Sequence, residues 1–196
     1  MLRALLASVV AIVVSTVVLG FAYPALMTRI AQLTASHKAN GSLIVRNGTV
    51  VGSSLAAQEF TSPRYFHERP SATTPPYNPA FTTFSNLGPT NPALAKLVKQ
   101  NADAILKLEG PYNPGLTIHQ IPVDAVVPSG SGIDPEISIA YADLQERRIA
   151  AVRHLPLATV QSLIEQHTVG RQLGFFGEAG VNVLNLNLAL DSEQGG

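Results

Sequence analysis

The sequence contains no cysteine and no tryptophan, and its charges cancel. Of its 196 residues, 13 are lysine or arginine and 13 are aspartate or glutamate, so the formal net charge is zero. A chain without cysteine forms no disulfide, no thiolate metal site and no cysteine nucleophile. A neutral chain lacks the basic surface with which most nucleic-acid-binding proteins neutralise phosphates, so we expect no nucleic-acid partner. Hydrophobic residues make up 46% of the chain, which excludes a disordered tail.

A long stretch near the N-terminus also lacks charge. No charged residue lies between Arg3 and Arg29, and residues 4–27 are predominantly apolar. As a helix this run spans about 36 Å, more than the roughly 30 Å of a bilayer's hydrocarbon core. A cleaved signal peptide is the alternative, but the apolar region of such peptides has only about 7–15 residues. The sequence therefore predicts a single transmembrane helix.

This helix divides the chain into two predicted parts. We expect residues 1–33 to form the anchor with a short stalk, and residues 34–196 to form one soluble domain. Basic residues flank both ends of the apolar run, so the positive-inside rule does not orient it. A short basic N-terminus ahead of an apolar run is typical of a signal-anchor, which places the N-terminus in the cytoplasm and the bulk of the chain outside it.

Local patterns in the second part mix strand and helix signals and predict a single mixed α+β domain. Asn47-Gly48 separates two β-branched runs and predicts a hairpin over 42–51. Asn91-Pro92 is a capping residue followed by proline at the first helical position, which predicts a helix from there to Gly110. Near the C-terminus, leucines alternate with asparagines over 181–190, which predicts a strand with one buried face.

Weaker signals fill the rest of the domain. We expect a short helix over 55–60, an extended segment over 115–127, a helix from Asp134 to about Leu155, and another from Pro156 to about Gly170. Residues 61–92 hold seven of the fourteen prolines, a density that excludes a long helix or a central strand. The same residues include tyrosines and phenylalanines, which a disordered linker would usually lack. We interpret 61–92 as an ordered interaction surface or ligand loop.

Motifs of the common enzyme chemistries are absent from the sequence. It has no G-x-x-x-x-G-K-[ST] phosphate-binding loop, no D-K-T-G-T phosphorylation motif and no H-E-x-x-H zinc motif. The five histidines (His37, His67, His119, His154 and His167) show no metal-ligand spacing. We therefore expect no catalytic residue, no metal site and no directly bound cofactor. The run Ser129-Gly130-Ser131-Gly132 leaves one alternative, a membrane-anchored hydrolase in which one of these serines pairs with His154 or His167; the other reading is a turn.

A cluster of aromatic and basic residues precedes Pro70. It comprises Arg64, Tyr65, Phe66, His67 and Arg69. Arginine binds carboxylates and stacks on rings, and arginine with aromatic residues is enriched at the centres of protein interfaces. These residues, together with Asn86 in the same loop, are our candidate partner-interface residues. The alternative is that Tyr65 and Phe66 belong to the core and the arginines are solvated.

Several short motifs taken together resemble one family. They are Tyr23-Pro24, GSLI at 41–44, YFHxRPSA at 65–72, PYNP at 76–79, SNLGPTNP at 85–92, PVD at 122–124, SGSGIDPEIS at 129–138, HTxGR at 167–171 and LNLALD at 186–191. In this order and spacing they resemble the C component of the Kdp-type high-affinity potassium-transporting P-type ATPase over nearly the whole chain. The chain departs from the family pattern at 81–84, where small residues are usual, at Phe176, where leucine is usual, and at Ala179-Gly180, where proline and another residue are usual.

The resemblance implies a non-catalytic accessory subunit of the cell (inner) membrane. The implied partners are a channel-like potassium-selecting subunit, a P-type ATPase subunit, a small stabilising peptide subunit and the lipid bilayer, with ATP and K⁺ handled by the complex. Members of this family are considered necessary for assembly. They are proposed to act on the side where the ion enters, or to raise the ATP affinity of the ATPase subunit as a catalytic chaperone.

The second of these roles points to a glutamine that matches Gln145, which we take as a candidate nucleotide-associated residue. ATP is cytoplasmic, whereas the signal-anchor orientation places this domain outside the cytoplasm. We therefore favour coupling to the ATPase through assembly over direct nucleotide capture. A tethered ligand-binding domain, with 61–92 as its binding site, is a further alternative to the transport subunit.

Overall fold

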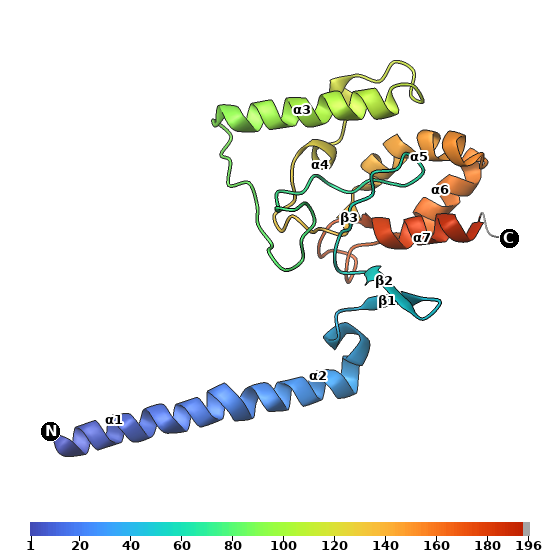
Figure 1. Ribbon diagram of the computed structural model, residues 1–196. Helices are drawn as coiled ribbons and strands as arrows, with labels where there is room; N and C mark the ends of the chain where they lie inside the picture. Colours follow the sequence, from blue (N-terminus) through green and yellow to red (C-terminus); the bar gives the residue numbers. More distant parts are fainter. Residues whose placement is uncertain (194–196) are drawn as a thin grey trace. The chain divides into compact units, whose positions relative to one another are not determined.

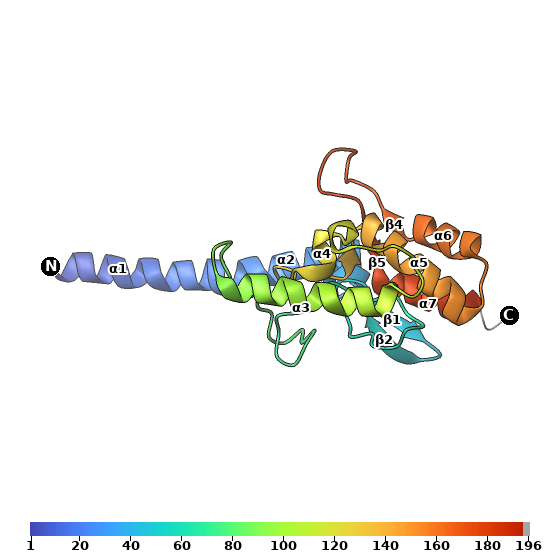
Figure 2. The ribbon, with the colours of Figure 1, turned by 90° about the horizontal axis from the view of Figure 1, so that it is seen from above.

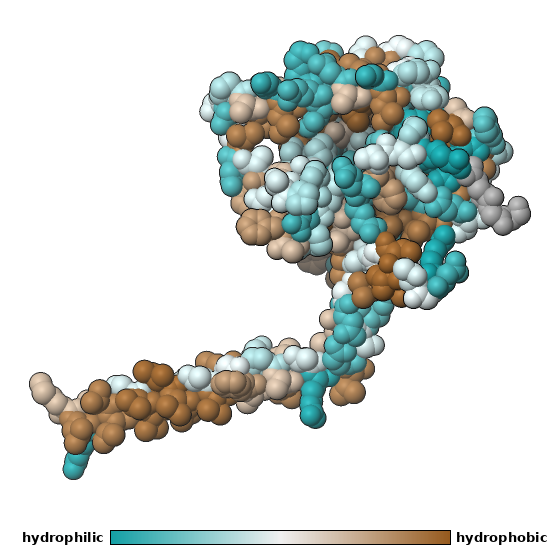
Figure 3. Space-filling model, viewed as in Figure 1, coloured by the Kyte–Doolittle hydropathy of each residue, from teal (hydrophilic) through white to brown (hydrophobic). Residues whose placement is uncertain are grey.

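The computed structural model describes residues 1–193, and the chain divides into two compact units, Met1–Leu43 and a second that begins at Ile44 (Figure 1). The first unit is dominated by the helical run Leu2–Ala39, which is kinked at Ala35, where φ is −151° and ψ is 48°. Its most apolar window has a mean hydropathy of 2.6 and no buried residue. Figure 3 shows apolar side chains along most of this helix and polar ones toward its C-terminal end. By length and composition the helix can cross a membrane.

The long helix changes its hydrogen-bond pattern ahead of its proline. It consists of α1 (Leu2–Ser15), a π-helical segment (Thr16–Ala22) and α2 (Tyr23–Ala39). Pro24 has no N–H, and its ring would clash with the carbonyl of Gly20 in a regular α-helix. The wider π-turns immediately before Tyr23-Pro24 accommodate this clash without breaking the helix.

The second unit, which we call the head, combines helices with two small sheets. A hairpin of β1 (Leu43–Arg46) and β2 (Thr49–Ser53) comes first, and β3 (Glu136–Ile137), β5 (Gly180–Asn182) and β4 (Thr168–Val169) form an antiparallel sheet in that order. The helices are α3 (Pro92–Glu109), α4 (Val123–Val126), α5 (Ile139–Arg153), α6 (Leu157–Gln166) and α7 (Val183–Glu193), with a 3₁₀ turn at Ile118–Gln120. The predicted α+β class behind one apolar N-terminal helix is confirmed.

The core of the head lies between α5, α6, α7 and the three-stranded sheet. Its fully buried side chains include Ile137, Tyr141, Ile149, Val160, Val181, Leu186 and Leu190. Phe66, from the irregular segment that precedes α3, is also completely buried in this core. The segment 54–91 contains no helix or strand, as its prolines predicted, yet it supplies a core residue.

Two local predictions are confirmed together with their physical reasons. Asn47 and Gly48 adopt positive φ angles of 50° and 77° in the turn between β1 and β2, as a tight hairpin requires. Asn91 caps α3, because its side chain accepts a hydrogen bond from the backbone N–H of Ala93 and Pro92 occupies the first helical position.

The predicted strand over 181–190 is wrong. Only Gly180–Asn182 is a strand, and Asn182 ends it by accepting a hydrogen bond from the N–H of Asn185 in the first turn of α7. Val183, Leu186, Asn187 and Leu190 are buried, a spacing of three and four residues that belongs to a helix. The leucines alternate with asparagines and so suggested a period of two, because the buried position 187 holds an asparagine instead of an apolar residue.

Three weaker predictions are also corrected. Residues 55–60 hold a turn organised by Ser53, whose hydroxyl accepts from the N–H of Leu55, and not a helix. Residues 115–127 contain the 3₁₀ turn and α4 instead of an extended strand. The helix expected from Asp134 begins at Ile139 with Ser138 as its cap, because β3 intervenes.

Candidate functional site

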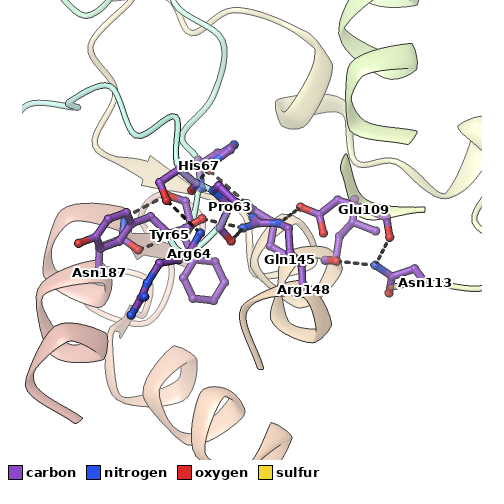
Figure 4. A network of polar contacts seen from close by, with 12 residues as sticks. Pro63, Arg64, Tyr65, His67, Glu109, Asn113, Gln145, Arg148 and Asn187 are labelled. Carbon is purple, nitrogen blue, oxygen red and sulfur yellow. Dashed lines mark hydrogen bonds and ion pairs between the residues drawn. The ribbon is translucent and has the colours of Figure 1, made fainter. Parts of the chain in front are cut away.

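The backbone of residues 63–67 is held almost entirely by side chains instead of by a neighbouring strand. Figure 4 shows this arrangement, in which polar side chains of α5 and α7 converge on an irregular stretch of main chain. We call residues 63–67 the clamped segment. Arg148 donates to the carbonyls of Pro63 and Tyr65, and Arg153 donates to the carbonyl of Arg64.

Two amide side chains complete the clamp. Asn187 accepts from the N–H of Phe66 at 2.8 Å and donates to its carbonyl at 2.9 Å. Gln145 does the same for His67, at 2.7 and 3.1 Å. A primary amide has the donor and acceptor of a peptide group, so each side chain acts as a one-residue strand partner. The clamped segment thus keeps its buried peptide groups paired without joining a sheet.

The guanidinium at the centre of the clamp is paired with a buried carboxylate. Arg148 and Glu109 are both fully buried, and their ion pair measures 2.7 Å. Burial raises the pKa of Glu109 above its ordinary value, and the contact with Arg148 opposes that rise. The remaining guanidinium nitrogen of Arg148 donates to Gln145 Oε1 at 2.9 Å. One arginine therefore ties α3, α5 and the clamped segment together.

A second arginine joins the clamped segment to α7. Arg153 forms a 2.9 Å ion pair with Asp191, and its guanidinium lies 4.8 Å from the centroid of the Tyr65 ring. The Tyr65 hydroxyl donates to the other carboxylate oxygen of Asp191 at 3.1 Å. Ring, guanidinium and carboxylate form one closed network within the head.

The six candidate interface residues occupy different environments. Phe66 is completely buried, His67 is half-buried, and burial lowers the pKa of the His67 imidazole so that it stays neutral near pH 7. Tyr65 is half-buried and Arg69 forms a 2.9 Å ion pair with Asp134. Arg64 and Asn86 are exposed. Most of the aromatic and basic cluster thus faces inward, and its role in binding partners stays a prediction.

Gln145, the candidate nucleotide-associated residue, has no exposed surface. Its oxygen accepts from both His67 and Arg148, and its nitrogen donates to the His67 carbonyl. In this conformation the amide presents no polar atom to a nucleotide, so the residues present do not form an ATP site here. The nucleotide role of Gln145 stays a prediction.

The serines considered as nucleophiles serve a turn. Ser129 Oγ accepts from the N–H of Gly132 and Ser131 Oγ from the N–H of Ile133. His154 is exposed at the C-terminal end of α5 with a positive φ of 56°, and His167 contacts the carbonyl of Leu163. Within residues 1–193, the structure brings neither serine into a hydrogen bond with these histidines. The same residues contain no group of three or more histidine or acidic side chains that could hold a metal ion.

One buried carboxyl group lies outside the clamp network and gives a pH prediction. Glu68 is 4% exposed, and one of its oxygens is buried without a hydrogen-bond partner among the described residues. Burial raises the pKa of Glu68 from 4.5 to about 8. Because the folded state holds this proton more tightly than the unfolded state, the group's stabilising contribution is complete below pH 4.5 and is lost as the pH rises to about 8.

We expect Glu68→Gln to remove this part of the pH dependence. A neutral amide needs no desolvation of charge, so the variant should be more stable than the parent chain at pH 9 and close to it at pH 5. Urea unfolding of the full chain in detergent at both pH values measures the difference. The prediction fails if the gap between variant and parent does not widen as the pH rises.

Sequence reasoning missed the residues that organise this region. Glu109, Arg148 and Asn187 are each inconspicuous in sequence, and their contacts with each other and with the clamped segment join residues 39 to 121 positions apart. A second missed feature is the apolar sequence Leu173-Gly174-Phe175-Phe176, which lies exposed between β4 and β5.

Comparisons with known proteins agree with the sequence motifs. Residues 5–192 match the family described as K⁺-transporting ATPase, c chain (KdpC). The potassium-transporting ATPase KdpC subunit of Sorangium cellulosum is 51% identical over 192 residues, covering 97% of this chain and 98% of that protein. The corresponding subunits of Paraburkholderia phymatum and Herpetosiphon aurantiacus are 51% and 53% identical, with 90% and 92% of both chains covered. The chain therefore belongs to the KdpC family, the c chains of K⁺-transporting ATPases.

Proposed function

We propose that this chain is a non-catalytic accessory subunit that helps to assemble an ATP-driven potassium-uptake complex in the cell membrane. The observation that carries the proposal is the family match over residues 5–192, joined to a single N-terminal helix long and apolar enough to cross a bilayer. The partners we propose are a channel-like potassium-selecting subunit, a P-type ATPase subunit and a small stabilising peptide.

The head, in this proposal, lies outside the cytoplasm. A basic residue, Arg3, precedes the apolar helix, as in a signal-anchor. ATP is then on the opposite side of the membrane from Gln145. The buried amide of Gln145, whose oxygen and nitrogen both form hydrogen bonds, is better suited to holding His67 in place than to binding a nucleotide.

Any effect on ATP affinity would accordingly pass through contacts with the other subunits. A mechanism of this kind needs the head to be rigid, because a flexible surface can adapt to either conformation of a bound partner and so shifts the equilibrium between them little. The clamp supplies rigidity by pairing the main chain of residues 63–67 with side chains of two helices. Direct ATP binding predicts instead that ATP raises the thermal stability of this chain by itself.

Co-purification tests the assembly role. When the full chain is expressed with the three proposed partners and solubilised in mild detergent, all four should elute together. Deleting residues 4–27 should lower recovery of the head with the partners by about tenfold or more, because the anchor keeps the head at high effective concentration beside them.

A matched control separates anchoring from specific helix contacts. In it, residues 4–27 are replaced by a polyleucine helix of the same length, which restores membrane insertion only. Recovery with this helix would assign assembly mainly to the head, and failure to recover would assign it to the native helix sequence. The proposal is wrong if the unaltered chain elutes alone while the partners assemble without it.

A further inference from the structure

The segment between β4 and β5 forms a projecting hairpin with an apolar tip. Figure 2 shows it extending away from the body of the head, above β4 and β5 in that view. We call residues 171–178 the tip loop. Its main chain is organised by reciprocal hydrogen bonds between Gln172 and Phe176, both 2.9 Å, and by a bond from Gly174 N–H to the Arg171 carbonyl. Backbone hydrogen bonds within the tip loop therefore define its conformation.

The large apolar side chains of the tip loop point into solvent. Leu173 is 83% exposed, Phe175 65% and Phe176 57%. The two phenylalanine rings pack on each other with centroids 4.2 Å apart. Leu173, Gly174 and Gly177 all have positive φ angles, of 53°, 82° and 76°, a conformation that is unfavourable for leucine. The backbone therefore holds apolar side chains outward at a strained position, whereas folding alone would favour burying them.

Charge around the apolar tip is cancelled within the loop. Arg171 at one end forms a 2.6 Å ion pair with Glu178 at the other. The loop carries no other charged residue. The exposed surface of the tip loop is consequently apolar and without net charge. The partner surface that matches it best is an apolar, uncharged pocket.

We propose that the tip loop docks Leu173, Phe175 and Phe176 into an apolar pocket on another protein subunit of the potassium-transporting ATPase. The inference rests on the proposed function only in requiring that this chain assembles with other subunits. Paired aromatic side chains on a preorganised turn form the kind of anchor that dominates protein interfaces.

Two observations favour a protein pocket over the lipid surface as the occupant. Loops and helices that bind membrane surfaces combine apolar residues with unpaired lysine or arginine, which attract anionic headgroups. The tip loop has one arginine, and that residue is paired with Glu178. Lipid is also fluid and needs no fixed shape, whereas the hydrogen-bonded turn and the packed ring pair define one shape.

Photo-crosslinking of the assembled complex tests this directly. The full chain, with Phe175 replaced by p-benzoylphenylalanine, is co-expressed with the proposed partners and irradiated in native membranes. We expect a covalent product with one partner subunit, identified by mass, at a yield about tenfold above that from the same residue placed at exposed Ala158 on α6. Adducts with lipid only, with a second copy of this chain only, or at the Ala158 level would overturn the proposal.

A second variant measures the contribution to assembly. Phe175→Ser with Phe176→Ser should leave the stability of the head unchanged, because both side chains are exposed. Dissociation of the chain from the solubilised complex should become about ten- to hundredfold faster. Leu55→Ser is the matched control, since Leu55 is 59% exposed and lies outside the tip loop. Unchanged dissociation in the double variant contradicts docking by the tip.

The two proposals fail in distinguishable ways. Loss of co-purification by the unaltered chain contradicts the assembly function itself. Normal co-purification with no crosslink from position 175 and no change in dissociation contradicts only the docking of the tip loop.

Discussion

Replacing Arg148 with leucine is expected to lower the free energy of unfolding of the head by about 3–5 kcal/mol. The variant leaves the Glu109 carboxylate buried without its cation, and it removes the donors to the carbonyls of Pro63 and Tyr65. Each of these groups would keep its desolvation cost without a partner. Urea unfolding of the full chain in detergent, followed by circular dichroism, measures the change.

Arg147 provides the matched control for this prediction. It is the preceding residue on the same helix but is exposed, so Arg147→Leu should change stability by about 0.5 kcal/mol or less. The double variant Glu109→Leu with Arg148→Leu should recover part of the loss, because no unpaired carboxylate remains. Full recovery would mean that the contacts with Pro63 and Tyr65 contribute nothing, and equal losses for Arg147 and Arg148 would contradict the clamp.

The clamp changes the interpretation of the aromatic and basic cluster. Arginine and aromatic residues in one short stretch are typical of an interface, and the sequence favoured that role. In the fold, the buried ring of Phe66 belongs to the core. The ring of Tyr65 contacts both the Phe60 ring, at a centroid distance of 5.1 Å, and the guanidinium of Arg153. Phe175 and Phe176 are exposed aromatic side chains that do lie together, in a loop where the sequence analysis noted only the departure from the family pattern at Phe176.

Local chemistry determined which elements were predictable. The hairpin turn at Asn47-Gly48 and the cap at Asn91-Pro92 depend on residues adjacent in sequence, so their patterns were sufficient. The apolar N-terminal helix was predictable because it needs no tertiary partner to explain its composition. These elements depend little on contacts with residues distant in the sequence.

Contacts between distant residues account for what could not be predicted. The pairing of Gln145 with His67 joins positions 78 residues apart, and nothing in the sequence near either residue indicates it. Residues 63–65 form a turn, in which the N–H of Tyr65 donates to the Ser62 carbonyl, and helical side chains bind the main chain of residues 63–67 without any partner strand. The same contacts explain why Asn187 is buried, and a buried asparagine is what made the sequence of α7 resemble that of a strand.

Asn187→Leu is expected to lower the free energy of unfolding by about 2–4 kcal/mol, since it leaves both the N–H and the carbonyl of Phe66 buried and unpaired. For a protein of this size the melting temperature should fall by several degrees. Asn185→Leu, two positions earlier, is the matched control, because Asn185 is only half-buried and no hydrogen bond of its side chain contributes to the clamp.

Comparing the effects of Asn187→Leu and Asn185→Leu also tests whether residues 181–190 form a strand or the helix α7. Residues two apart on a strand share a face, so a strand over 181–190 would place both asparagines on the solvent side and make both substitutions mild. On α7 they point in different directions, and only Asn187 faces the clamped segment. Thermal unfolding of both variants, monitored by circular dichroism, should therefore show a large loss for Asn187→Leu alone. Equal effects at the two positions would contradict both the helix and the clamp that it carries.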